Sequence, residues 1–236
     1  MTSSRNKSAE LALLGTLFLA PAAVIWAHAL QSATLFALHP ALNALALLVC
    51  TPSGLYLILE RKNVSDHATR RVSFIAIVWM TKLHLLVNVV AALLLSGAGA
   101  IAFVTKRASQ ERHFVSRHSW AGLTTALLLM LNILQGLLLT FEGKRSNWQW
   151  KDETHGLVGT LIYIGSGVTL IFGVQSEMWG NASLSAELQE RLKVMIIVAH
   201  AALLGKMWLQ SKTTSSDSTS RPSSTAGEAI DSKKSD

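Results

Sequence analysis

The sequence has a single cysteine, Cys50, among its 236 residues. No disulfide can therefore form within the chain, and one thiolate cannot supply the ligand set of an iron–sulfur cluster or a thiolate zinc site. Charged residues are also scarce: they make up 15% of the chain, while 50% of the residues are hydrophobic. This balance is unlike that of a soluble domain or a disordered chain, and it indicates a polytopic membrane protein.

Six long apolar runs predict six transmembrane helices. Each is long enough for a helical span, which needs about 20 residues, and in lipid only a helix satisfies its own backbone. The first run is interpreted as a span, because it is too long for the apolar core of a signal peptide and Pro21 interrupts it. The six runs are Leu11–Leu30, Leu35–Leu59, Phe74–Val104, Phe114–Phe141, His155–Gln175 and Leu192–Leu209.

The loops predict the orientation of these spans. With six spans both termini lie on one face of the membrane, and the loops on that face hold most of the lysines and arginines outside the spans. The positive-inside rule therefore predicts a cytoplasmic N-terminus (residues 1–10), a six-helix domain (residues 11–210) and a disordered cytoplasmic tail (residues 211–236). The charge of +7 is thus explained by topology, and nothing indicates binding to nucleic acid. A glycan on Asn63, in place of one on Asn181, would mean the inverted orientation.

Four of the eight histidines fall one on each of the four central spans. Ionisable residues inside a membrane are rare and are candidates for function, although each alone could be a hydrogen bond between helices. Every one lies near the start of its own span, and successive spans run in opposite directions. The histidines therefore form two layers: His39 with His118 near the outer face, and His84 with His155 near the cytoplasmic face. His28, His67 and His200 are interpreted as interfacial, loop or packing residues.

A pair of imidazoles in each layer favours haem over zinc. Zinc needs three or four protein ligands, and the four central spans contain no Asp or Glu to complete such a set. A haem lacks only two axial ligands, and two imidazoles leave no open iron position, which favours electron transfer. Helix bundles commonly hold cofactors between inward-facing side chains. The sequence thus predicts a central four-helix bundle with two b haems; the alternative is a histidine-lined metal or proton transporter without haem.

Short motifs around these histidines resemble the cytochrome b561 family. They are "LHP" at His39, "KLH" at His84, "RHSW" at His118 and "HGLVG" at His155, in this order over residues 35–175. The closer resemblance is to short animal members, the cytochrome b561 domain-containing protein 2 type. The resemblance implies a homodimeric transmembrane reductase in endoplasmic reticulum or vesicle membranes. Ascorbate on the cytoplasmic side would be the electron donor, and monodehydroascorbate or a ferric chelate on the outer side the acceptor.

The resemblance also implies a site for ascorbate, an anion, beside the inner haem. Lys82 matches a family lysine that precedes the third-span histidine, although it could equally extend to the membrane interface as lysines at span ends do. Lys151, one turn before His155, is a second candidate. Arg71 and Arg145 are weaker additions.

On the outer face the resemblance implies a second substrate site. His113 matches a family histidine five residues before the fourth-span ligand, and Arg112 and Arg117 would attract an anionic acceptor. His113 could instead be an interfacial histidine. It could also be the iron ligand in place of His118, which is disfavoured because His118 lies deeper in the apolar run.

Overall fold

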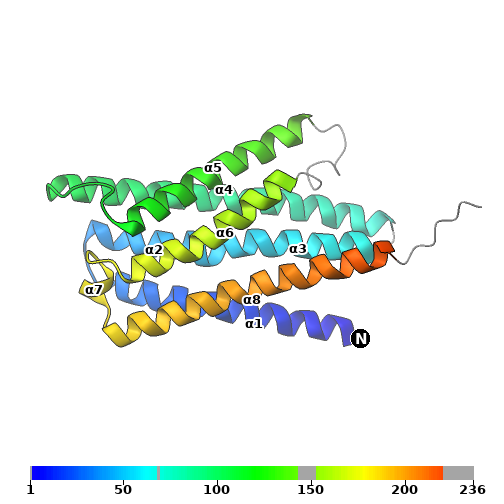
Figure 1. Cartoon of the computed structure of the whole chain (residues 1–236), viewed down its shortest axis with the longest axis horizontal. Coiled ribbons are helices and arrows are strands. Elements are labelled where there is room, and N and C mark those ends of the chain that lie inside the picture. Colours follow the sequence, from blue (N-terminus) through cyan, green and yellow to red (C-terminus); the bar gives the residue numbers. More distant parts are fainter. Residues whose placement is uncertain (1, 68–69, 143–152, 220–236) are drawn as a thin grey trace, which may run out of the picture.

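The computed structural model describes residues 2–67, 70–142 and 153–219, and side chains within 7–61, 75–139 and 153–212. All regular structure in these residues is helical (Figure 1). Six helical stretches are long and apolar enough to cross a membrane, as predicted: Lys7–Ala29, Leu35–Arg61, Ile75–Ala108, Arg117–Leu139, Glu153–Val174 and Ala186–Lys212. The elements are α1 (Thr2–Ala29), η1 (Leu35–Ala37), α2 (Leu38–Ala44), η2 (Leu45–Cys50), α3 (Thr51–His67), α4 (Arg70–Ala108), α5 (Arg117–Glu142), α6 (Glu153–Val174), α7 (Gly180–Ser183) and α8 (Ala186–Thr219).

The four central spans form a ring, and the first and last spans flank it. Helix α3 packs along α4, and α5 packs along α6; α4 also contacts α5, and the second span contacts α6. The second span and α5 are therefore diagonal partners, as are α4 and α6. Helices α1 and α8 pack on each other, with α1 against α2 and α8 against α6 (Figure 1).

The start of α1 and the end of α8 lie at the same end of the molecule (Figure 1). This agrees with an even number of spans. Helix α8 continues to Thr219, past residue 211 at which a disordered tail was predicted to begin. Residues 220–236 of that tail lie outside the described residues.

The second span is a composite of four consecutive helical segments. Pro52 lies inside it, and a proline removes the hydrogen bond to the carbonyl four residues earlier and clashes with that carbonyl. The six residues of η2, directly before Thr51, form the wider turns of a π-helix. The Thr51 hydroxyl donates to the Ala46 carbonyl oxygen at 2.9 Å. The span thus passes the proline without a break between His39 and the end of α3.

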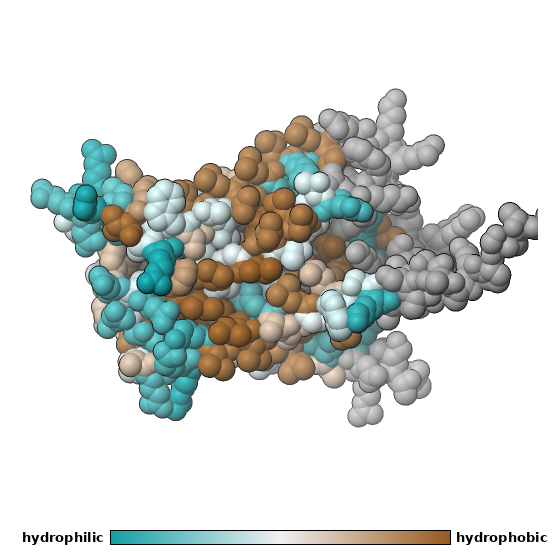
Figure 2. All heavy atoms as spheres, in the orientation of Figure 1, coloured by the Kyte–Doolittle hydropathy of each residue, from teal (hydrophilic) through white to brown (hydrophobic). Residues whose placement is uncertain are grey.

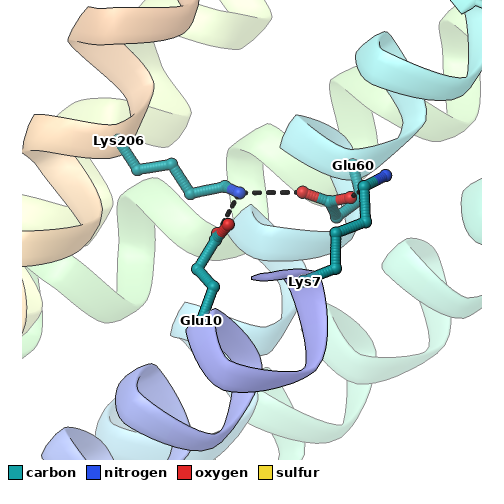
Figure 3. A network of polar contacts seen from close by, with 4 residues as sticks. All are labelled: Lys7, Glu10, Glu60 and Lys206. Atoms are coloured by element: carbon teal, nitrogen blue, oxygen red, sulfur yellow. Dashed lines mark hydrogen bonds and ion pairs between the residues drawn. The ribbon is translucent and has the colours of Figure 1, made fainter. Parts of the chain in front are cut away.

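Charged side chains join α1 and α8 to the end of α3 (Figure 3). The Lys206 ammonium pairs with Glu10 and, at 2.8 Å, with Glu60; Lys7 pairs with Glu60 at 3.4 Å. The side chains of Lys206 and Glu60 are only 14% and 13% exposed. Removing one partner of a buried pair leaves an uncompensated charge, so this network holds the flanking helices to the ring.

His200 lies in the contact between α6 and α8, as its packing interpretation expected. Its Nδ1–H donates to the Ile196 carbonyl oxygen at 2.8 Å, and its Nε2 lies 3.1 Å from the Ser166 hydroxyl oxygen. Its ring stacks on Tyr163 at 4.8 Å between centroids. A buried histidine with both nitrogens in contact with helix partners satisfies its polar groups inside the molecule.

The outer surface of the helices is apolar over the length of the spans. Figure 2 shows a broad hydrophobic band between the ends, with hydrophilic residues gathered at the end that carries α7. Exposed large hydrophobic side chains occur on all six spans, among them Leu13, Leu38, Leu93, Leu131, Leu161 and Ile197. Soluble proteins rarely expose contiguous apolar surface of this extent. The chain is a multi-pass membrane protein.

Candidate functional site

The first histidine pair joins α2 and α5 across the ring. The Nε2 atoms of His39 and His118 are 3.5 Å apart, and the two rings are nearly perpendicular. Two imidazoles that ligate one metal from opposite sides have nitrogens about 4 Å apart, twice a bond of about 2 Å. The pairing of the second and fourth spans is the one that the sequence predicted.

Backbone carbonyls hold the other nitrogen of each ring in this pair. His39 Nδ1 lies 2.8 Å from the Ala98 carbonyl oxygen, and His118 Nδ1 lies 3.0 Å from the Thr169 carbonyl oxygen. Because a carbonyl only accepts, Nδ1 carries the proton and donates. Each Nε2 therefore presents a lone pair toward the opposite ring. Metal-binding histidines are oriented in this way by their outer partners.

The second pair joins α4 and α6. The ring centroids of His84 and His155 are 6.4 Å apart, and the rings are again steeply inclined. His84 Nδ1 donates to the Gly54 carbonyl oxygen at 2.9 Å. The third and fifth spans are thus paired as predicted, and His84 has the same backbone lock as the histidines of the first pair.

The two pairs are separated by the same length of helix on two different spans. On α4, Ala98 at the first pair lies 14 residues after His84 at the second; on α6, Thr169 lies 14 residues after His155. At 1.5 Å per residue both intervals correspond to about 21 Å. The pairs therefore occupy opposite halves of the ring.

Small and amide side chains recur around the rings. Asn43 and Asn88 each follow a histidine by four residues, and each amide donates to the carbonyl of that histidine, at 2.9 and 2.8 Å. A Cβ built on Gly173 would lie 3.0 Å from Cε1 of His118, and one on Gly136 would lie 3.1 Å from Cε1 of His155. Glycine at these two positions leaves the room that the rings occupy.

The loop between α4 and α5 leads directly into His118 of the first pair. His113 stacks on Phe103 with 4.4 Å between ring centroids, and the next residue, Phe114, has a φ of 52°, which is uncommon for a bulky residue. Arg112 and Arg117 are exposed. The predicted acceptor residues thus surround the same end of the ring, while His118 rather than His113 faces His39.

Lys82 is directed away from the second pair. Two residues along a helix correspond to about 200° of rotation, so Lys82 and His84 project from opposite faces of α4. The Lys82 side chain is exposed, and its ammonium lies 5.7 Å from the centroid of the exposed Trp79 ring. This position suits a lysine at the membrane interface. Lys151 and Arg145 lie outside the described residues, as does the side chain of Arg71.

Two cations, Arg61 and Lys106, lie close to the histidine pairs. In the sequence they contributed only to the prediction of membrane orientation. Arg61, the last residue of the second span, is only 6% exposed and close enough to His84 for its charge to act on that ring. Lys106, in the last turn of α4, acts in the same way on His39 and His118. Their neighbours in sequence are typical loop residues, so only the packing distinguishes them.

The donor set fits haem better than a metal ion held by protein alone. Among the described residues no group of three His, Cys, Asp or Glu side chains could hold a metal. Each pair offers two imidazoles facing each other, which is the axial ligation that a haem lacks. The glycines beside His118 and His155 keep space at the rings.

Residues 76–181 match the family described as eukaryotic cytochrome b561. The matched segment contains His84, His118 and His155, and it ends beyond α6, while His39 precedes it. A search of curated proteins returned no match. The match is a similarity over less than half of the chain, and the six spans and the facing histidines agree with it.

Proposed function

We propose that the chain, as a member of the cytochrome b561 family, transfers electrons from cytoplasmic ascorbate to an acceptor on the other side of the membrane. Among the family's members the chain resembles the cytochrome b561 domain-containing protein 2 type. The observation that supports this proposal is the arrangement of two facing histidine pairs about 21 Å apart along α4 and α6. A single site in one half of the ring would not connect the two faces.

In this proposal His39 and His118 hold one b haem, and His84 and His155 hold a second. Haems held there would supply one-electron transfer. The carbonyls of Ala98, Thr169 and Gly54 keep three of the four rings oriented, so that little reorganisation is needed when the charge at the site changes. The apolar helices exclude water between the two pairs.

Electrons enter at the His84–His155 end, which the loop charges predict to be cytoplasmic. The ascorbate monoanion loses one electron and one proton there and leaves as the monodehydroascorbate anion, with the proton released to water on the same side. Arg61, where the second span ends, is a buried cation at this end of the ring. Lys82 and Lys151 are proposed to attract the ascorbate anion toward this end from the surface.

Electrons leave at the His39–His118 end, where the proposed acceptors are monodehydroascorbate or a ferric chelate. Both are anions under ordinary conditions, and the exposed Arg112 and Arg117 provide positive charge at this end. His113, held against Phe103, is proposed to contact the acceptor. The proposed setting is the endoplasmic reticulum or a vesicle membrane, with a homodimer as the assembly and both termini in the cytoplasm.

The test is electron transfer across a sealed bilayer. The purified chain is placed in lipid vesicles that contain a ferric chelate, and ascorbate is added outside. We expect reduction of the enclosed iron at a rate that depends on the protein and is lost in His118→Ala. Reduction of the haem without reduction of the enclosed iron would reject the transmembrane route, and a protein that binds no haem would favour the transporter alternative.

A further inference from the structure

Thr105, in the last turns of α4, has a buried hydroxyl without a hydrogen-bond partner among the described residues. Several other helical Thr and Ser hydroxyls in the described residues donate to the carbonyl four residues earlier. Thr16, Thr81, Ser96 and Thr160 do so at 2.7–2.9 Å. A buried hydroxyl without a partner is costly, and binding a suitable group relieves that cost.

The Thr105 hydroxyl lies on the side of α4 that faces the first histidine pair. Thr105 follows Ala98, whose carbonyl holds His39, by seven residues. Seven residues are two helical turns, about 10 Å of rise, and bring the side chain within about 20° of the same helix face. Thr105 therefore lies between the His39–His118 pair and the α4–α5 loop.

Lys106 places a positive charge at the same position along the bundle. Its side chain is only 16% exposed although it lies at the end of a span. The ammonium has long contacts, 3.7 Å to a Glu111 carboxylate oxygen and 3.4 Å to the Arg112 carbonyl oxygen. Charge-assisted hydrogen bonds are normally 2.7–2.9 Å, so neither contact fully occupies its donors.

The second pair has a cation in the equivalent place. Gly54 accepts from His84 as Ala98 accepts from His39. Arg61 follows Gly54 by seven residues, as Thr105 follows Ala98, and Arg61 is likewise close enough for its charge to act on His84. Arg61 thus corresponds in position to Thr105, and Lys106 lies one residue further along α4.

We propose that Thr105 and Lys106 form a binding site for a carboxylate or similar anionic oxygen between the His39–His118 pair and the α4–α5 loop. The hydroxyl donates one hydrogen bond and the ammonium supplies a second with its charge. The anion is either a carboxylate of the haem held by this pair or the anionic acceptor itself. The inference rests on the proposed function and names two residues that bind at its exit end.

The experiment compares four variants of the full-length, haem-loaded protein. Lys106→Gln removes the charge, Lys106→Arg keeps it, Thr105→Val removes the hydroxyl at equal size, and Thr105→Ser keeps it. Arg107→Gln is the matched control, because it removes the same charge one residue further along at an exposed position. Two quantities are measured in each variant. The first is the midpoint potential, without acceptor, of the haem proposed between His39 and His118, which is identified by its absence from His39→Ala. The second is the KM for an anionic ferric chelate.

A haem carboxylate predicts a lower midpoint potential in Lys106→Gln, because the carboxylate loses its counter-charge and the oxidised form is favoured. We expect the equilibrium constant for one-electron reduction of this haem to fall roughly tenfold, which corresponds to a midpoint potential about 59 mV lower. A smaller shift of the same sign is expected in Thr105→Val. An acceptor anion instead predicts an unchanged potential in Thr105→Val, and a roughly tenfold higher KM in both Lys106→Gln and Thr105→Val. In both cases Lys106→Arg and Thr105→Ser remain close to wild type.

The proposal is overturned if Lys106→Gln and Thr105→Val match Arg107→Gln in both potential and KM. It is also overturned if the serine and valine variants at residue 105 are equally impaired, since the hydroxyl would then be irrelevant. Failure of the proposed function has a different signature: the wild-type protein would bind no haem, or ascorbate would not reduce it.

Discussion

Replacing Gly173 by alanine should selectively remove the haem that we propose lies between His39 and His118. The new Cβ would lie 3.0 Å from Cε1 of His118, whereas non-bonded carbons are about 3.5–4.0 Å apart. The ring must therefore move by roughly 0.5 Å or more. Metal sites tolerate shifts of only about 0.2 Å in ligand distance, and the ring is also held by the Thr169 carbonyl. Overpacking of this kind costs about 1–3 kcal/mol.

That energy corresponds to roughly 5- to 150-fold weaker haem binding at one site, at 1.4 kcal/mol per factor of ten. The assay is the haem content per chain with the reduced absorption spectrum, after dialysis against a haem scavenger. Gly173→Ala is expected to keep about one haem. Gly156→Ala is the control on the same helix, because a Cβ there meets nothing within 4 Å. It should keep both haems and be neutral or slightly stabilising, as alanine favours a helix.

Gly136→Ala completes the test from the other half of the ring. Its Cβ would lie 3.1 Å from Cε1 of His155, so it should affect the haem that Gly173→Ala leaves in place. If Gly173→Ala and Gly156→Ala retain the same haem content and the same spectrum as wild type, the close approach of Gly173 to His118 does not constrain the site. The space beside the His118 ring would then not limit haem binding.

Three further predictions concern the ligands, the donor end and the flanking helices. His84→Ala should abolish reduction by ascorbate with loss of one haem, while His39→Ala should lose the other haem and keep ascorbate reduction; two haems in either purified variant would contradict the ligand assignment. Lys82→Ala should retain both haems and slow reduction by ascorbate, most clearly at low salt, and an unchanged low-salt rate in stopped-flow traces would exclude a role for this lysine. Lys206→Met should destabilise the fold by on the order of 1–3 kcal/mol, seen as a lower thermal midpoint that Lys206→Arg largely restores; an unchanged midpoint would show that the network in Figure 3 contributes nothing to stability.

The spans and the pairing of the histidines were predictable from the sequence for simple physical reasons. Long apolar runs have one structure in lipid, and antiparallel order fixes which histidines share a depth. His39 with His118 and His84 with His155 follow from those two facts. The structure also shows that backbone carbonyl oxygens accept hydrogen bonds from Nδ1 of three of these histidines. The sequence could not predict these bonds, because every residue has a backbone carbonyl.

Other features of the site depend on packing that a single sequence does not reveal. Lys106 resembles any basic residue at a span end, and only its low exposure and its closeness to the rings separate it from Arg107. Lys82 shows the opposite case, since two residues of separation seem close in sequence but correspond to opposite helix faces. Gly173 could have been a general packing glycine, and its partner His118 belongs to another span.

The absorption spectrum of the purified chain, with haem counted per polypeptide, tests the central claim most directly. The account predicts two low-spin b haems per chain, both reduced after ascorbate is added, because each facing histidine pair completes one iron. A colourless protein obtained with ample haem during expression, or a single haem per chain, would contradict it.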